Sequence, residues 1–222
     1  MRKSVFCLLL ACLVAGSFAA AQEHPAEEMT PEIYYLVPEF SQGTVYFNDR
    51  GPAEGLLNIC AVDHTLRFMD DNGQELSASD VDNVSRVVIG DALFIRANGF
   101  FYRMYPVSSL EGIALKREVK YITDGKQGAY GTVDRTSSIR DYKTIYGADG
   151  VSYQLQKDKK YPFEVNERLF LYKGKDVLVF NKRNLKKLFP DKKEEIDQYF
   201  KSGHSIPGKL DEALELLNNW NR

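Results

Sequence analysis

Apolar and polar residues alternate in short runs through most of residues 33–180, and turn-forming residues separate the runs. A period of two is typical of a strand that buries one face and exposes the other. Asn72-Gly73 and Asn98-Gly99 are two-residue turn sequences of the kind that joins antiparallel strands, and Gly174 lies in a third predicted turn. The predicted strands cover residues 44–47, 56–62, 65–69, 86–89, 92–96, 100–105, 112–122, 151–155, 169–172 and 177–180.

After residue 180 the apolar residues recur every three or four positions, which is the period of an amphipathic helix. Three short helices are predicted. Asn181 caps the first, Pro190 opens the second, Gly203 ends the second, and Ser205 caps the third. The third helix carries an apolar stripe formed by Leu210, Ala213, Leu214, Leu217 and Trp220. These helices are expected to pack on the sheet or on each other.

The predicted elements indicate an α+β protein: an antiparallel β-rich body, sandwich or barrel-like, with a small C-terminal helical appendage. One globular domain is expected over residues 33–222, and the chain has no internal repeat. Its expected parts are a β-rich part (33–122), a long connection (123–150), β-hairpins (151–180) and helices (181–222). Residues 22–32 are polar and acidic with two prolines, and they are expected to form a disordered leader.

The first 21 residues predict a secretory signal peptide. A positive head precedes an apolar run at residues 5–14 that is too short to span a bilayer, and Ala19 to Ala21 supply small residues before a cleavage point. The mature chain is therefore expected to begin at Gln22 and to be exported, to the periplasm or the cell surface, without a transmembrane segment. An alternative stays open, in which Cys12 is lipidated and becomes the new N-terminus.

The mature chain is expected to be mildly acidic. The sequence has 29 basic and 31 acidic residues, and removal of Arg2 and Lys3 leaves 27 against 31, a net charge of −4. An acidic exported protein is a poor candidate for nucleic-acid binding, which depends on neutralising phosphates. A local basic run is interpreted as the solvated side of two helices, with an anionic partner as the alternative. The run consists of Lys182, Arg183, Lys186, Lys187, Lys192 and Lys193.

Potentially reactive side chains are few. Cleavage at Ala21 would leave Cys60 as the one cysteine, so no intramolecular disulfide is expected. Apolar neighbours predict that Cys60 is buried and unreactive, rather than paired with His64 for catalysis. The histidines His24, His64 and His204 are too dispersed along the chain to suggest a zinc site, so neither a metal nor a cofactor is expected.

Two classes of function remain open. The sequence lacks the serine nucleophile elbow, the zinc-protease helix motif and the phosphate-binding loop. These missing motifs favour a non-enzymatic binding or interaction module of the cell envelope. The alternative is an envelope hydrolase that acts on glycan or peptide through carboxylates.

Any binding site is predicted to use the 123–150 connection. This segment is glycine-spaced and has no persistent period, and so long a connection is unusual in a compact domain. Tyr130 and Tyr142 offer flat amphipathic faces, and Arg135 and Arg140 offer forked donors for carboxylate or phosphate groups. The expected partner is therefore an unidentified protein or a polar or anionic ligand.

Several segments resemble those of exported proteins of uncharacterised function that are common in Bacteroidota. The matching segments are GTVYF (43–47), IGDALFIRANGFFYRMYPV (89–107), GIALKREVKYI (112–122) and NLKKLFPDKKEEIDQYFK (184–201), followed by a leucine-rich terminal helix. The resemblance covers most of the mature chain and implies an envelope location in a Gram-negative cell. The matching segments are structural in type, so the resemblance implies no catalytic residue.

Overall fold

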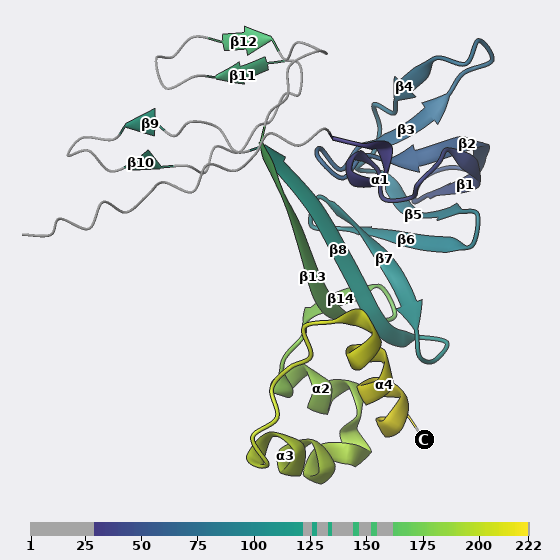
Figure 1. Ribbon diagram of the computed structural model, residues 1–222. Helices are drawn as coiled ribbons and strands as arrows, with labels where there is room; N and C mark the ends of the chain where they lie inside the picture. Colours follow the sequence, from purple (N-terminus) through teal and green to yellow (C-terminus); the bar gives the residue numbers. More distant parts are fainter. Residues whose placement is uncertain are drawn as a thin grey trace, which may run out of the picture.

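The computed structural model describes residues 29–121 and 162–221, together with four short strands between these two ranges. The short strands form two antiparallel pairs, β9 (Lys126–Gln127) with β10 (Val133–Asp134) and β11 (Thr144–Tyr146) with β12 (Ser152–Gln154). Figure 1 shows a β-rich body at one end of the described chain and a helical unit at the other. The predicted α+β class, with an antiparallel β-rich body and C-terminal helices, is confirmed.

Ten of the strands form one antiparallel sheet, which is not closed. Its strand order is β14-β13-β8-β7-β6-β5-β1-β2-β3-β4, so β14 and β4 are its edges. The strands of the β-rich body are β1 (Ser41–Phe47), β2 (Ala53–Ile59), β3 (Leu66–Met69), β4 (Glu75–Ser77), β5 (Val84–Ile89) and β6 (Ala92–Ala97). The remaining strands are β7 (Phe100–Pro106), β8 (Glu111–Tyr121), β13 (Phe163–Lys173) and β14 (Asp176–Val179).

The turns between strands occur where the sequence predicts them. Asn98 and Gly99 have φ angles of 50° and 81° between β6 and β7, and Gly73 has a φ of 74° between β3 and β4. Gly174 has a φ of 59° in the turn that joins β13 to β14. Glycine and asparagine tolerate this left-handed backbone better than other residues, so these short sequences specify the hairpins locally.

The two longest strands, β8 and β13, connect the β-rich body to the helical unit (Figure 1). They pair along their whole length, from Phe163 opposite Tyr121 to Lys173 opposite Glu111. The strand β7 pairs with only the first part of β8, ending at Leu115. The rest of β8 lies near the residues that follow β2. There the backbone N–H of Val119 donates to the carbonyl oxygen of Ala61 at 3.0 Å.

Among the described residues, the interior of the β-rich body is apolar apart from two buried polar side chains, Asn58 and His64. Inward residues of six strands form this core, including Ile59, Val87, Phe94 and Phe101, which are fully buried. The Oδ1 atom of Asn58 accepts from the N–H of Ile59 at 2.8 Å, and its Nδ2 atom donates to the carbonyl oxygen of Val37 at 3.0 Å. A buried amide is stable only with such partners, so Asn58 fixes the segment before β1 against β2.

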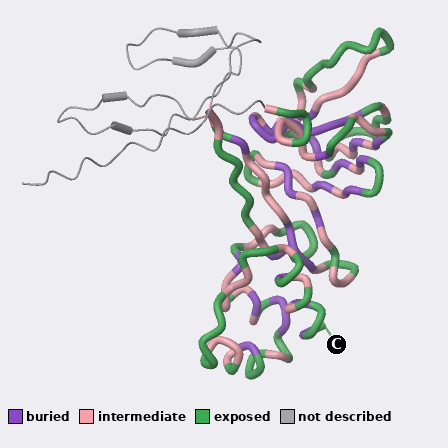
Figure 2. The backbone as a smooth tube through the Cα atoms, in the orientation of Figure 1, coloured by how far each residue is buried: buried purple, intermediate pink, exposed green. Residues whose placement is uncertain are grey.

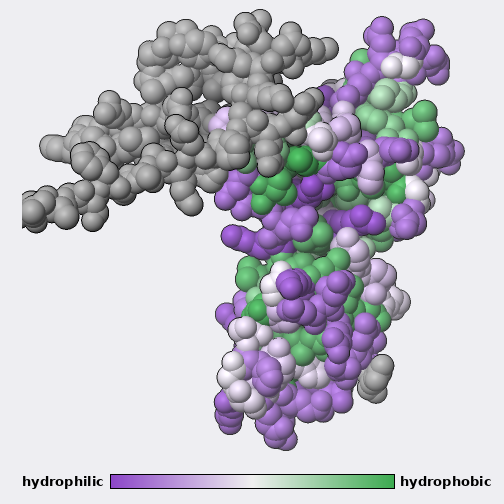
Figure 3. Space-filling model, viewed as in Figure 1, coloured by the Kyte–Doolittle hydropathy of each residue, from purple (hydrophilic) through white to green (hydrophobic). Residues whose placement is uncertain are grey.

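The helical unit covers one face of β14 and of the adjoining ends of β8 and β13 (Figures 1 and 2). It contains α2 (Lys182–Leu188), the 3-10 helix η1 (Pro190–Lys192), α3 (Lys193–Lys201) and α4 (Leu210–Trp220). The predicted stripe on α4 is confirmed, because Ala213, Leu217 and Trp220 are buried against Ile113 and Leu171 of the sheet. Figure 3 shows apolar residues on the viewed face where the sheet meets this unit, and mainly hydrophilic residues over the helices.

Two predicted helix caps have different outcomes. The Asn181 side chain accepts from the N–H of Asn184 at 2.8 Å, so the predicted cap of α2 is confirmed. The predicted Ser205 cap is wrong, because α4 begins at Leu210 and its N-cap position is Lys209, without a side-chain cap. Residues 204–207 belong to no helix or strand, and a serine caps only when the helix starts directly after it.

The predicted end of the leader also needs correction. The short helix α1 covers Pro31–Tyr34, and Met29 packs against a buried cluster that includes Cys60 and Val119. The leader was expected to extend to residue 32, but ordered structure is already described from Met29 onward. The reason is tertiary: apolar residues of this segment pack against the end of β2, and a composition dominated by polar residues does not reveal that contact.

Candidate functional site

The four side chains proposed from the sequence, Tyr130, Arg135, Arg140 and Tyr142, lie outside the residues that the structure describes. Within the 123–150 connection the description is limited to the backbone of β9, β10 and β11. Any carboxylate side chains in this connection that a hydrolase would use also lie outside what the structure describes. These predictions therefore stay predictions, and the described residues offer other candidates.

Cys60 is fully buried and has no disulfide partner, as predicted. Burial raises the pKa of the Cys60 thiol to about 11, and the nearby charge of Asp63 adds to the rise. A thiol with such a pKa is protonated near neutral pH and is a poor nucleophile. The position at the end of β2, packed against Val119 and α1, makes Cys60 a structural residue.

His64 is also buried, in a turn rather than in a strand. Its backbone N–H donates to the carbonyl oxygen of Cys60 at 3.0 Å, and its φ of 51° is left-handed. Its ring lies edge-on to Phe100, with 4.8 Å between ring centroids, and neither ring nitrogen has a hydrogen-bond partner among the described residues. Desolvation lowers the pKa of His64 to about 4, so the ring is neutral near pH 7. The His64 ring makes no hydrogen bond to the Cys60 thiol, as a catalytic dyad would require.

A compact group of charged side chains next to these residues is paired internally. The Arg67 Nη2 atom lies 2.6 Å from the Asp63 Oδ2 atom and its Nη1 atom lies 3.8 Å from the Glu75 Oε1 atom. The Tyr35 hydroxyl donates to Glu75 at 2.6 Å, and burial together with that hydrogen bond raises the pKa of Tyr35. These contacts link α1 to β3 and β4, while the buried Arg67 Nε atom has no hydrogen-bond partner among the described residues.

The basic run at residues 182–193 is partly neutralised inside the helical unit. The Lys182 and Lys186 ammonium groups of α2 lie 2.6 Å and 2.7 Å from the carboxylate of Asp197 on α3. Their hydrogen bonds lower the pKa of Asp197 to about 2. Two of the six basic residues therefore join α2 to α3, which agrees with the interpretation of this run as part of a solvated helical face.

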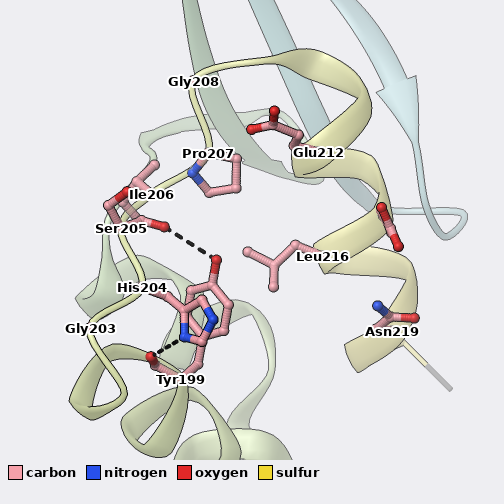
Figure 4. Close-up of a pocket in the computed structure, with 11 residues that line it drawn as sticks. Tyr199, Gly203, His204, Ser205, Ile206, Pro207, Gly208, Glu212, Leu216 and Asn219 are labelled. Atoms are coloured by element: carbon pink, nitrogen blue, oxygen red, sulfur yellow. Dashed lines mark hydrogen bonds between the residues drawn. The ribbon is translucent and has the colours of Figure 1, made fainter.

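An open pocket lies between the α3–α4 connection and α4 (Figure 4). Its volume is about 480 Å³. The residues that line it include Tyr199, His204, Ser205, Pro207, Glu212, Glu215, Leu216 and Asn219. Residues Glu212, Glu215, Leu216 and Asn219 recur every three or four positions, so they share one face of α4, while Ala213, Leu217 and Trp220 on the other face enter the core.

One wall of the pocket is an aromatic pair held by backbone hydrogen bonds. The rings of Tyr199 and His204 are stacked, with 4.4 Å between centroids and an interplanar angle of 16°. The Tyr199 hydroxyl donates to the carbonyl oxygen of Ser205 at 3.2 Å, and the His204 Nδ1 atom lies 3.0 Å from the carbonyl oxygen of Tyr199 (Figure 4). Tyr199 also contacts Trp220 edge-on, so the core of the helical unit holds this wall in place.

The α4 side of the pocket carries two exposed carboxylates, Glu212 and Glu215. Glu212 has a distant cation, the Lys209 Nζ atom at 3.9 Å, and Glu215 has no ion-pair partner among the described residues. An exposed carboxylate next to a stacked aromatic pair is suited to a cation, which gains from the negative charge and from the ring face. A carboxylate general acid is instead held in an apolar, water-excluding environment, which this open wall does not provide.

Sequence reasoning located His204 in the connection between two helices but did not assign it to a site. The turn residues Gly203, Pro207 and Gly208 mark the connection in the sequence. They do not reveal that the connection returns along α4, because that path depends on how Tyr199 packs against Trp220. The polar face of α4 can be recognised in the sequence, but a polar helix face usually contacts only solvent and so does not by itself indicate a binding site.

Among the described residues, no group of three or more histidine, cysteine, aspartate or glutamate side chains is arranged to hold a metal ion. No described helix has the length and apolar character that crossing a bilayer requires. Comparison of the chain with protein-family models, with curated proteins and with solved structures found no match. The pocket on α4 is therefore interpreted from its own geometry.

Proposed function

We propose that this protein is a non-enzymatic interaction module whose helical unit receives a cationic group of a partner in the pocket on α4. The observation that carries the proposal is that Glu212 and Glu215 line the same pocket as the stacked Tyr199–His204 pair. An ammonium or guanidinium group could contact the carboxylates and the aromatic face together. The open, exposed form of the pocket favours binding of a side chain over enclosure of a whole small molecule.

The proposed ligand is opposite in charge to the one expected from the sequence. Arg135 and Arg140 suggested an anionic ligand at the 123–150 connection, whereas the pocket carries carboxylates. Two basic residues of the same helical unit are engaged elsewhere, because Lys182 and Lys186 bind Asp197. A basic partner segment also suits a chain whose net charge is negative.

A blocked peptide that contains arginine and lysine is expected to bind the purified protein at low ionic strength, and binding should weaken as salt is added. Replacement of both pocket carboxylates, Glu212→Gln with Glu215→Gln, is expected to reduce the affinity at least about tenfold, because two charge-assisted contacts are lost. Isothermal titration calorimetry measures the affinity. The matched ligand control is the same peptide with citrulline and glutamine in place of the cationic residues.

The matched protein control is Glu194→Gln with Glu195→Gln on α3. It removes the same charge from exposed positions that do not line the pocket. This control should keep the wild-type affinity. Equal losses in the two double variants would show that net charge, and not the pocket, attracts the peptide. Failure of the peptide to bind the wild-type protein at low salt would reject a cation-binding pocket.

We further propose that the module acts in the cell envelope after export, on the basis of the first 21 residues and of the resemblance to exported proteins of Bacteroidota. The exported protein is expected to begin at Gln22 and to carry no lipid. N-terminal sequencing and intact mass measurement of protein recovered from the envelope test this prediction. A mature chain that begins at Cys12 and carries acyl groups would contradict it and would support lipid anchoring.

A further inference from the structure

One part of the sheet edge has no partner strand among the described residues. The strand β14 pairs with β13 only from Phe170 to Lys173. The preceding part of β13, residues 163–169, pairs with β8 on one side alone. Residues 164–168 are exposed, and they form the green stretch of the tube along β13 in Figure 2. Within the described part of the chain, residues 164–168 of β13 therefore have no partner strand at one edge and are exposed on both faces.

The backbone of this edge is oriented for further pairing. The N–H of Gly174 donates to the carbonyl oxygen of Leu110 at 2.6 Å, which places even-numbered residues of β13 in hydrogen bonds with β8. Successive residues of a strand direct their N–H and C=O groups to opposite sides. Odd-numbered Phe163, Val165, Glu167 and Leu169 therefore present their N–H and C=O groups at the open edge, which is the arrangement that recruits another strand.

We propose that this edge pairs with the same edge of a second copy of the chain, antiparallel, around a two-fold axis at Asn166. The sequence of the edge, FEVNERL, is complementary to itself in this register. Glu164 then lies opposite Arg168 of the second copy, and Arg168 lies opposite its Glu164. On the other face, Val165 lies opposite Glu167. Opposite charges directly across an antiparallel pair stabilise it.

The neighbouring strand supports the same register. On β8, Lys120 lies beside Glu164 and Arg117 lies beside Glu167, with 3.7 Å between the Arg117 Nε atom and the Glu167 Oε1 atom. The carboxylate of Glu167 is thus already compensated when it lies opposite Val165 of the second copy. Each carboxylate on the edge of the proposed dimer has a cationic neighbour within its own chain or across the interface.

Shifted registers lose this complementarity. A shift that centres the two-fold axis at Glu167 places two glutamates directly opposite each other, and a shift that centres it at Val165 places Glu164 opposite Asn166. Neither shift retains both glutamate–arginine pairs. Charges on a sheet edge commonly prevent pairing with other chains. Here the charges are spaced symmetrically about Asn166. They are therefore complementary to an identical strand and unfavourable for most other strands, so the expected partner is a second copy of the chain.

Cross-linking at the symmetry axis tests the pairing directly, in the chain from Gln22 onward, which retains every described residue. Residues at a position without mutual hydrogen bonds face each other at about 4.5 Å between Cα atoms, within reach of a disulfide. Asn166→Cys is therefore expected to give a covalent dimer under mild oxidation. Ser77→Cys, an exposed position on the opposite sheet edge, is the matched control and should stay monomeric, since native Cys60 is buried.

Charge exchange tests the register independently. Arg168→Glu alone and Glu164→Arg alone each place like charges across the interface twice, and each is expected to raise the dimer dissociation constant at least about tenfold. The double variant restores opposite charges and should regain dimerisation. Sedimentation equilibrium measures the constant, and circular dichroism confirms that each variant is folded.

The proposal fails if the wild-type protein is monomeric at every concentration and Asn166→Cys forms no covalent dimer. It also fails if a dimer forms that neither charge variant weakens, because another surface would then be responsible. Recovery of dimerisation in the double variant supports the pairing. The inference concerns β13 and is independent of the pocket on α4, so either conclusion can fail without the other.

Discussion

Replacement of Gly112 by alanine is expected to lower the free energy of unfolding by about 3 kcal/mol. A Cβ atom at this position in β8 would lie 2.7 Å from the Cε1 atom of Tyr172 and far too close to the backbone carbonyl oxygen of Tyr105. Tyr172 is buried and could turn aside only by leaving its cluster, and the carbonyl belongs to the neighbouring strand. The strands must therefore separate at the point where they enter the helical unit.

Gly55→Ala is the matched control for Gly112→Ala. Its added Cβ atom would lie 3.8 Å from a methyl group of Leu57, which is an ordinary contact. That variant should be neutral or slightly stabilising, because alanine reduces the conformational freedom of the unfolded chain. Urea unfolding of both variants measures the difference. Free energies of unfolding within 0.5 kcal/mol of each other, on the order of measurement scatter, would mean that the β7–β8 approach is not tightly packed.

The second large effect is expected in acid and depends on His64. Burial lowers the pKa of His64 to about 4 in the folded protein, whereas the pKa of a histidine in an unfolded chain is about 6.5. Between these values the unfolded chain binds a proton that the folded protein does not, so the free energy of unfolding falls as the pH falls. The loss begins near pH 6.5 and reaches about 3 kcal/mol at about pH 4.

The variant His64→Asn isolates this contribution. Asparagine tolerates the left-handed backbone of residue 64 and does not titrate, so its cost is the same at every pH. The difference in unfolding free energy between pH 7 and pH 4 should shrink by about 3 kcal/mol relative to the wild type. Carboxylates such as Asp197 titrate equally in both proteins. Equal acid losses in wild type and His64→Asn would contradict the assignment.

Features that depend on a few neighbouring residues could be predicted from the sequence. The Asn98-Gly99 turn, the hairpin at Gly174 and the Asn181 cap are examples, because the residue itself supplies the backbone freedom or the hydrogen bond. The apolar stripe of α4 was predicted for a similar reason, since its period is visible in the sequence. Each of these signals is local, and the α+β class follows from their order.

Features that depend on distant contacts could not be predicted. The strand β13 begins at Phe163, but residues 164–168 are exposed on both faces and so lack the alternation that marks a strand. Their extended form is imposed by β8. The start of α4 at Leu210 likewise depends on how the preceding connection packs on Tyr199. Glu212 and Glu215 look like ordinary solvated residues until that connection is placed against them.

The pairing of Tyr121 with Phe163 has a consequence for how this chain can vary. The polypeptide leaves the sheet at the end of β8 and re-enters it directly opposite, at the start of β13. The stability of the pairing between these strands therefore depends only weakly on the length of the sequence between them. The entropic cost of closing a longer loop rises by only about 0.6 kcal/mol per doubling of its length. The sequence between them can therefore be lengthened, shortened or exchanged by design while the scaffold is kept, and a foreign domain grafted there would have attachment points already one strand apart.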